Sequence, residues 1–99
     1  MARLHVKTEP SDGATIITIA IDGKVVAVPG RGTGEADIDV EGSCGDGSSH
    51  TLLYTFFGKA GETLAVTVTC GATEVCKLKK AEVSQVGEPH CTGWKKFTL

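Results

Sequence analysis

Asparagine is absent from this chain of 99 residues, and aromatic residues make up only 5% of it. Without an asparagine acceptor the chain cannot carry N-linked glycans. Tight turns must be built from Asp-Gly or from glycine alone. No apolar run approaches the roughly 20 residues that a spanning helix needs, so we expect no membrane span. The formal net charge of -2 argues against a protein that tracks the phosphates of a nucleic acid.

The length is that of a single domain, because a chain of this size builds one core and no second one. Hydrophobic residues make up 40% and charged residues 22%, an ordinary balance for a folded protein. Threonine, valine and isoleucine are abundant, and these β-branched side chains fit a pleated surface. The composition therefore predicts one all-β domain over residues 1–99.

Apolar and polar residues alternate along most of the chain, which is the pattern of half-buried strands. The strands predicted in this way cover residues 3–7, 15–21, 24–28, 35–41, 51–57, 63–70, 76–83 and 94–99. One change of parity, near Lys79-Lys80, predicts a β-bulge. Strands of this length between glycine-rich turns indicate an antiparallel β-sandwich of about seven or eight short strands.

The clearest local motif is a hairpin over residues 15–28. Asp22-Gly23 supplies a two-residue turn, in which positive φ angles are needed. One register places the apolar side chains of both strands on a single face. It pairs Ile21 with Lys24, Ile19 with Val26 and Ile17 with Val28.

The middle third of the chain has a recognisable succession of elements. An alternating strand ending in Ile38-Asp39-Val40 is followed by a glycine-rich loop, an aromatic strand and a Gly-x-x-Gly turn before Glu62-Thr63-Leu64-Ala65-Val66. This succession resembles the immunoglobulin-like modules of bacterial surface and secreted proteins. The resemblance implies an immunoglobulin-like sandwich and no particular chemistry. Antibody-type domains are not implied, because Trp94 follows every cysteine.

Four cysteines in a short, glycine-rich, all-β chain favour a disulfide framework and a secreted or cell-surface protein. The opening residues have no apolar stretch of the kind found in signal peptides, so a cytoplasmic protein with reduced thiols is the alternative. Cys70 and Cys76 flank a short turn at inward positions, which predicts a bond between them. Cys44 and Cys91, both in predicted loops, would form the second bond.

Metal binding is a competing reading of the same residues. Cys44, His50, Cys70, Cys76, His90 and Cys91 include enough ligands for a zinc ion, but no C-x2-C pair is present. Asp37 and Asp39 lie on one strand face and are close enough to share a Ca²⁺ ion, which the loop residue Asp46 could join. The favoured reading of this acidic row is a solvated strand face that discourages edge pairing. We therefore expect no metal cofactor.

Catalysis has little support in the sequence. His50 follows Ser48, and Asp46 is near, but neighbours in sequence do not define a catalytic triad. A Gly-x-Ser-x-Gly elbow is absent, and Gly30-Arg31-Gly32-Thr33-Gly34 lacks the ending of a phosphate loop. We expect a protein that is not an enzyme, with a small hydrolase as a remote alternative.

The expected function is that of a non-catalytic module that binds or assembles through loops and strand edges, with a protein or a glycan as partner. The alternative is a metal-dependent binder, either lectin-like with calcium or stabilised by zinc. The candidate binding residues are Arg31, Asp46, His50, His90 and Trp94 in the loops at 29–34, 42–50 and 88–94. Trp94 could stack on a sugar or anchor a partner, although a buried position covering the end of the core is favoured.

Overall fold

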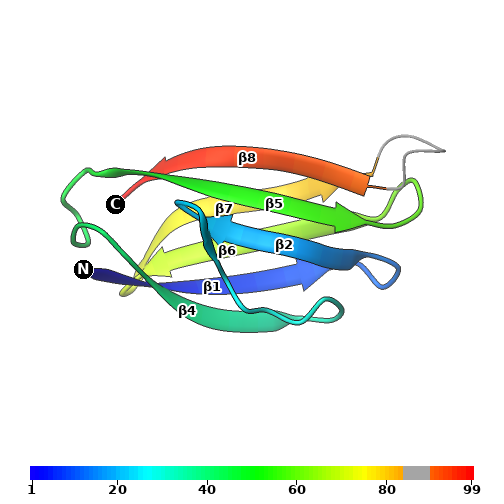
Figure 1. The fold of residues 1–99 in the computed structure, drawn as a ribbon, viewed down its shortest axis with the longest axis horizontal. Helices are drawn as coiled ribbons and strands as arrows, with labels where there is room; N and C mark the ends of the chain where they lie inside the picture. The colour runs from blue at the N-terminus through cyan, green and yellow to red at the C-terminus, as the bar shows by residue number, and fades with distance from the viewer. Residues whose placement is uncertain (84–89) are drawn as a thin grey trace.

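The structure is a computed structural model that describes residues 1–83 and 90–99 (Figure 1). The strands are β1 (Ala2–Pro10), β2 (Thr15–Ile21), β3 (Lys24–Val25), β4 (Gly34–Val40), β5 (Ser49–Phe57), β6 (Thr63–Cys70), β7 (Thr73–Glu82) and β8 (His90–Thr98). The described residues contain no helix, and hence none long and apolar enough to cross a membrane. The expected all-β architecture is confirmed.

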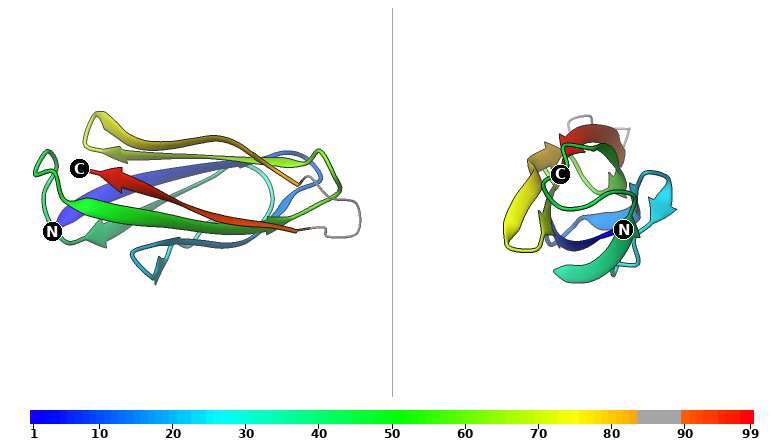
Figure 2. Two further views of the ribbon diagram at one scale, coloured as in Figure 1. Left: turned by 90° about the horizontal axis from the view of Figure 1, so that it is seen from above. Right: turned by 90° about the vertical axis from the view of Figure 1, so that its left-hand side faces the viewer.

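Two antiparallel sheets pack face to face, as in a β-sandwich (Figure 2). The first, called the β1 sheet below, has the order β4-β1-β6-β7, and the second, called the β5 sheet, has the order β3-β2-β5-β8. The body is elongated, with extents of 42 × 20 × 20 Å. Its strands run along the long axis, so turns gather at the two ends and each sheet offers one long outer face (Figure 1).

The core lies between the sheets and is built from alternate residues of the long strands. Leu4 and Val6 of β1 and Leu52 and Phe56 of β5 are fully buried, Tyr54 packs against the same core, and His5 and Leu53 point outward. Full burial of such a side chain contributes roughly 1.5–3 kcal/mol to folding. The alternation of the sequence is therefore the pattern that places these strands.

The outer face of β1 and β4 is covered by paired charges. In the register of these strands Arg3 faces Asp39, His5 faces Asp37 and Lys7 faces Glu35. Arg3 Nε lies 3.4 Å from Asp39, and His5 contacts both Asp37, at 2.8 Å, and Glu35, at 2.9 Å. The hydrogen bonds to Asp37 and then to Glu35 raise the pKa of His5 above its ordinary value. The acidic row of β4 is thus matched by a basic row on β1.

The predicted hairpin turn is confirmed. Asp22 and Gly23 have φ angles of 52° and 81°, as a two-residue turn of this kind requires, and Ile21 pairs with Lys24. The predicted inward position of Ile17 is wrong. The pairing of β2 with β5 shifts between Ile16 and Thr18, so Ile17 is an extra residue and is exposed.

Two irregularities interrupt β7. Leu64 pairs with Ala81 but Val66 pairs with Leu78, which places an extra residue between Leu78 and Ala81 and confirms the predicted bulge. The second shift lies opposite Val68 and Thr69 and leaves Val75 as its extra residue. The second bulge makes Cys76 point inward, although the pairing of Cys70 with Thr73 at the turn would place Cys76 outward.

The predicted disulfide pairing is wrong. Cys44 is bonded to Cys70, with their Cα atoms 5.8 Å apart, whereas Cys76 and Cys91 are free. The turn at Gly71-Ala72 pairs Cys70 with Thr73, so Cys76 lies farther along β7, opposite Val68. Cys44 reaches Cys70 because β1 lies between β4 and β6 and starts at the end of the sandwich where both finish.

The last strand is longer than predicted. It begins at His90 instead of Trp94, so His90 and Cys91 belong to β8 and not to a loop. The part of the predicted loop at residues 88 and 89 lies outside the described residues. β8 pairs with β5 along its whole length, and Trp94 lies opposite Leu53. Trp94 is therefore placed midway along an edge strand of the β5 sheet.

Candidate functional site

The predicted binding residues do not come together in one place. Asp46 and His50 lie at the end of the sandwich where β5 begins, and a serine joins them. Arg31 and His90 lie toward the opposite end, where β5 finishes. Arg31 donates to a backbone carbonyl of the β1–β2 turn, 2.8 Å away. Trp94 lies between the two ends, on the outer face of the β5 sheet.

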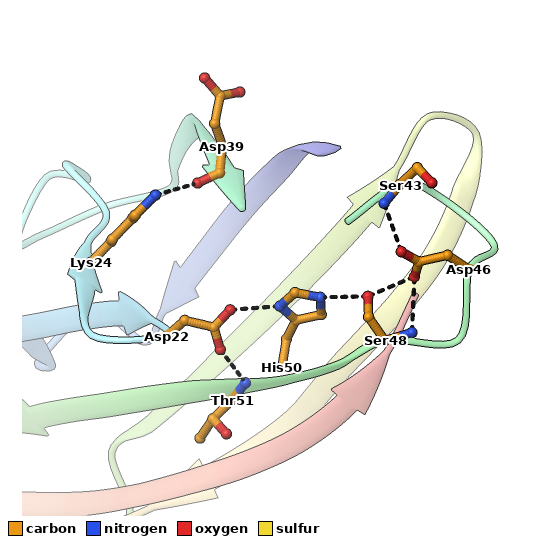
Figure 3. A network of polar contacts seen from close by, with 8 residues as sticks. All are labelled: Asp22, Lys24, Asp39, Ser43, Asp46, Ser48, His50 and Thr51. Carbon is orange, nitrogen blue, oxygen red and sulfur yellow. Dashed lines mark hydrogen bonds and ion pairs between the residues drawn. The ribbon is translucent and has the colours of Figure 1, made fainter. Parts of the chain in front are cut away.

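The first candidate site is a chain of polar contacts from Asp22 through His50 and Ser48 to Asp46 (Figure 3). His50 Nδ1 lies 2.5 Å from Asp22 Oδ2, and its Nε2 lies 2.9 Å from Ser48 Oγ. Ser48 Oγ donates to Asp46 Oδ1 over 2.6 Å. The order carboxylate, imidazole, hydroxyl is that of a catalytic triad, with a second carboxylate added beyond the hydroxyl.

The β2–β3 turn places Asp22 against the start of β5. The amide of Asp22 donates to the carbonyl of Thr51, and the amide of Thr51 donates to the Asp22 carboxylate. His50 points inward and is 4% exposed, with its ring 5.7 Å from that of Phe97. Burial raises the pKa of Asp22, but the hydrogen bonds from His50 and Thr51 outweigh burial, and the pKa lies below its ordinary value.

The loop from residue 42 to residue 48 is held at several points. The Asp46 carboxylate accepts hydrogen bonds from the Ser48 hydroxyl, the Ser48 amide and the Ser43 amide, which lower its pKa to about 2. The Cys44–Cys70 bond joins the loop to β6. The Gly47 amide donates to the Leu99 carbonyl, and the Leu99 amide donates to the Ser48 carbonyl.

The number of hydrogen atoms shared among Asp22, His50, Ser48 and Asp46 limits the chemistry of this site. Ser48 has one hydroxyl hydrogen, and Asp46 receives it. All three contacts then form together only when both ring nitrogens of His50 donate, one to Asp22 and one to Ser48. In that arrangement the imidazole has no free lone pair with which to act as a general base. The geometry fits a structural tie better than an activated nucleophile.

The acidic row of β4 is engaged in ion pairs. Asp37 contacts His5 and Asp39 contacts Arg3, so cations already occupy the side of these carboxylates that faces β1. Among the described residues, no group of three or more histidine, cysteine or acidic side chains is placed to hold a metal ion. Two of the six residues considered for zinc, Cys44 and Cys70, are consumed by the disulfide.

The second candidate site is the outer face of the β5 sheet. The favoured expectation of a buried Trp94 is wrong, since 63% of this side chain is exposed. All five large apolar side chains exposed within strands belong to this sheet: Ile17, Val25, Leu53, Phe57 and Trp94. In the described part of the chain, the one other exposed large apolar residue is Met1.

The register lines three of these side chains, Val25, Leu53 and Trp94, up across the sheet. Val25 pairs with Ala20, Ala20 with Leu53 and Leu53 with Trp94, so one apolar row crosses all four strands, although Ala20 within it is buried. A row of threonines lies beside it, in which the hydroxyls of Thr55 and Thr92 are 3.1 Å apart. Lys96 places its ammonium 6.0 Å from the centre of the indole ring. We call this surface the Trp94 face and define it by Val25, Leu53, Thr55, Thr92, Trp94 and Lys96.

With this geometry established, the chain was compared with known proteins. No family model, curated protein or solved structure matches it.

Sequence reasoning missed several residues of both sites. Asp22 was assigned to the turn alone, because nothing in the sequence pairs it with a histidine on another strand. Leu53 and Phe57 carry a usable signal, because they occupy the second face of a strand that is apolar on both sides. Their exposure shows that one apolar face of this strand is left for solvent or a partner.

Proposed function

We propose that this chain is a binding or assembly module that contacts its partner through the Trp94 face. The observation that carries the proposal is the concentration of exposed large apolar side chains on one of the two sheets. Contiguous apolar surface on a folded protein marks an interaction site more often than isolated apolar residues do. Exposed tryptophan is also enriched among the residues that dominate binding energies.

The contrast between the two outer faces supports this choice. On the β1 sheet the outward residues of β1 and β4 are matched pairs of opposite charge. On the β5 sheet the corresponding positions hold threonine, valine, leucine and tryptophan. The binding surface is therefore proposed on a sheet face, and the loops originally expected to bind serve to hold the ends of the sandwich.

The placement of the strands supports an immunoglobulin-like type. In that fold strand C lies between C′ and F, strand G beside F, and strand B between A and E. The order β3-β2-β5-β8 follows C′-C-F-G, and β1 beside β4 follows B-E. β6 then lies where strand A would, although it follows β5 in the chain, so the match is one of strand placement and not of connectivity. The Cys44–Cys70 bond supports a secreted or cell-surface location, because disulfides persist in oxidising compartments.

The test is a binding screen against immobilised polysaccharides and purified surface proteins, with two variants of the chain. Trp94→Ser changes the proposed face, and Lys7→Gln changes the outer face of the other sheet, where Lys7 lies opposite Glu35. We expect the partner to be retained by wild type and by Lys7→Gln and lost by Trp94→Ser. Binding that survives Trp94→Ser and is lost with Lys7→Gln would contradict the proposal.

A second candidate function is hydrolysis by Ser48, favoured by the ordered contacts of Asp22, His50 and Ser48. The Asp46 carboxylate, 2.6 Å from the serine oxygen, opposes it because it would repel a negatively charged nucleophile. The measurement is release of nitrophenol from a nitrophenyl acetate ester by wild type and by Ser48→Ala. We expect equal rates, and a burst seen in wild type alone would establish the second candidate instead.

A further inference from the structure

We infer that the partner of the Trp94 face is an acidic oligosaccharide, one whose pyranose rings carry carboxylates. The inference rests on the proposed function and names the ligand class for the same surface. Three properties of the face point to this ligand: its size, its mixture of an indole with hydroxyl groups, and the sign of its charge.

The size of the face suits a short polymer segment better than a protein. β5 and β8 have nine residues each. Nine residues and three long strands give a face roughly 30 Å long and about 14 Å wide. The projected area is about 400 Å², and the long, narrow shape matches an extended polymer lying along the strands better than a compact partner.

The side chains offer the two kinds of contact that a sugar needs. The exposed indole of Trp94 presents a flat apolar surface to the carbon–hydrogen face of a pyranose ring, and Leu53 extends that surface onto β5. Thr92 lies two residues from Trp94 on the same side of β8, hence about 7 Å away. Its hydroxyl contacts that of Thr55, and this pair keeps both a donor and acceptors for the hydroxyls of a bound sugar.

The charge of the face selects an anion. Lys96 lies beside the indole, and its ammonium, which has no ion pair with the described residues, is placed to meet a carboxylate on a ring stacked there. The outward positions of β2, β3, β5 and β8 in the described residues hold no aspartate or glutamate. His90 lies on the same side of β8, two residues before Thr92. The carboxylates of β4, Glu35, Asp37 and Asp39, contact Arg3 and His5 on the other side of the molecule.

The test uses an oligogalacturonate and the same oligomer after reduction of its carboxyl groups. These two probes share linkage and length and differ only at C6 of each ring, where a carboxylate is replaced by a neutral hydroxymethyl group. Trp94 is the single tryptophan of the chain, so its fluorescence reports on this face alone. We expect the acidic oligomer to shift and saturate the fluorescence, with calorimetry giving a Kd about tenfold tighter than for the reduced oligomer.

Four variants assign the contacts. Lys96→Gln should remove the roughly tenfold preference for the acidic oligomer, whereas Lys7→Gln, an equal charge change on the other sheet, should retain it. Thr92→Val should weaken the binding of both oligomers about three- to fivefold, because the Thr92 hydroxyl is lost. Trp94→Ala should abolish binding of both, measured by calorimetry. The exposure of these side chains predicts that all four variants unfold at the wild-type denaturant midpoint.

Equal affinities for the two oligomers, or acidic binding that survives Trp94→Ala, would overturn the inference. If neither oligomer binds while the earlier screen gives a protein partner that Trp94→Ser loses, the ligand class is wrong and the proposed function stands. If neither oligomer binds and no partner depends on Trp94, both fail.

Discussion

His50 Nδ1 lies 2.5 Å from the Asp22 carboxylate, although 28 residues separate the two in the chain. The contact joins the β2–β3 turn to the start of β5. A second contact of His50, with Ser48, adds the loop that precedes β5. One buried ring therefore holds three segments at one end of the sandwich. Such a ring matters more for folding than its exposed neighbours do, because the ring is itself buried and its removal breaks the contacts with Asp22 and Ser48.

Replacement of this ring is the first prediction. His50→Ala should lower the free energy of unfolding by roughly 2–3 kcal/mol, through lost hydrogen bonds and lost contact with Phe97. His90→Ala, which removes an exposed histidine, is the matched control and should change it by less than about 0.5 kcal/mol. Urea denaturation at neutral pH measures both. Equal effects of the two substitutions would mean that the polar chain adds nothing to stability.

The second prediction concerns the disulfide. The double variant Cys44→Ser with Cys70→Ser should lose about 2–4 kcal/mol of stability, because the bond closes a loop of 26 residues in the unfolded chain. Cys91→Ser removes a free and only partly buried thiol and should cost much less. Denaturation with and without reductant tests this: the reductant should weaken wild type and leave the double variant unchanged. A reductant effect that persists in the double variant would point to a different bond.

The third prediction is a pH dependence from His5. Its pKa is raised by Asp37 and Glu35, so its contribution to stability is fully present below the unfolded value, about 6.5. That contribution is lost as the pH rises through the higher pKa of the folded state. The melting temperature of wild type minus that of His5→Gln should therefore shrink as the pH rises above about 6.5. A difference that stays constant would show that the ion pairs with Asp37 and Glu35 do not form in solution.

The fourth prediction concerns the hydrogen bonds that the Asp46 carboxylate forms within its loop and their loss at low pH. With a pKa lowered to about 2 in the folded state, this carboxylate stabilises the loop above its ordinary pKa and loses that effect as the pH falls toward 2. The amides of Ser43 and Ser48 should be protected from hydrogen exchange at pH 5 and lose protection in Asp46→Asn. Asp12→Asn, an exposed change in the β1–β2 turn, should leave those amides as in wild type. Unprotected amides in wild type at pH 5 would refute the loop geometry.

Much of the fold could be predicted because it depends on local patterns. Alternation placed the long strands, Asp22-Gly23 fixed the hairpin turn, and the change of parity after Leu78 revealed a bulge. The bulge at Ile17 was missed because an extra isoleucine in an apolar strand leaves no break in the pattern. Hydrophobicity reports which side chains can be buried, whereas a bulge is decided by pairing with another strand.

The sites depended on contacts between distant segments and could be predicted only in part. Asp46, His50 and Trp94 were named from residue type alone, but the sequence did not bring Asp22 to His50. The disulfide failed for the same reason: proximity along the chain suggested Cys70 with Cys76, whereas strand order brought Cys44 to Cys70. Which strands are neighbours across a sandwich is set by the packing of all of them together.

The two bulges in β7 also bear on how the molecule behaves at high concentration. β7 and β4 are the edges of the β1 sheet, and an edge strand can recruit another chain through its unpaired backbone groups. Extra residues interrupt the regular spacing of those groups on β7, and alternating carboxylates repel a like strand from β4. The β1 sheet is in this way poorly suited to template fibrils, and any growth by strand addition would have to start from the regular edge at β8.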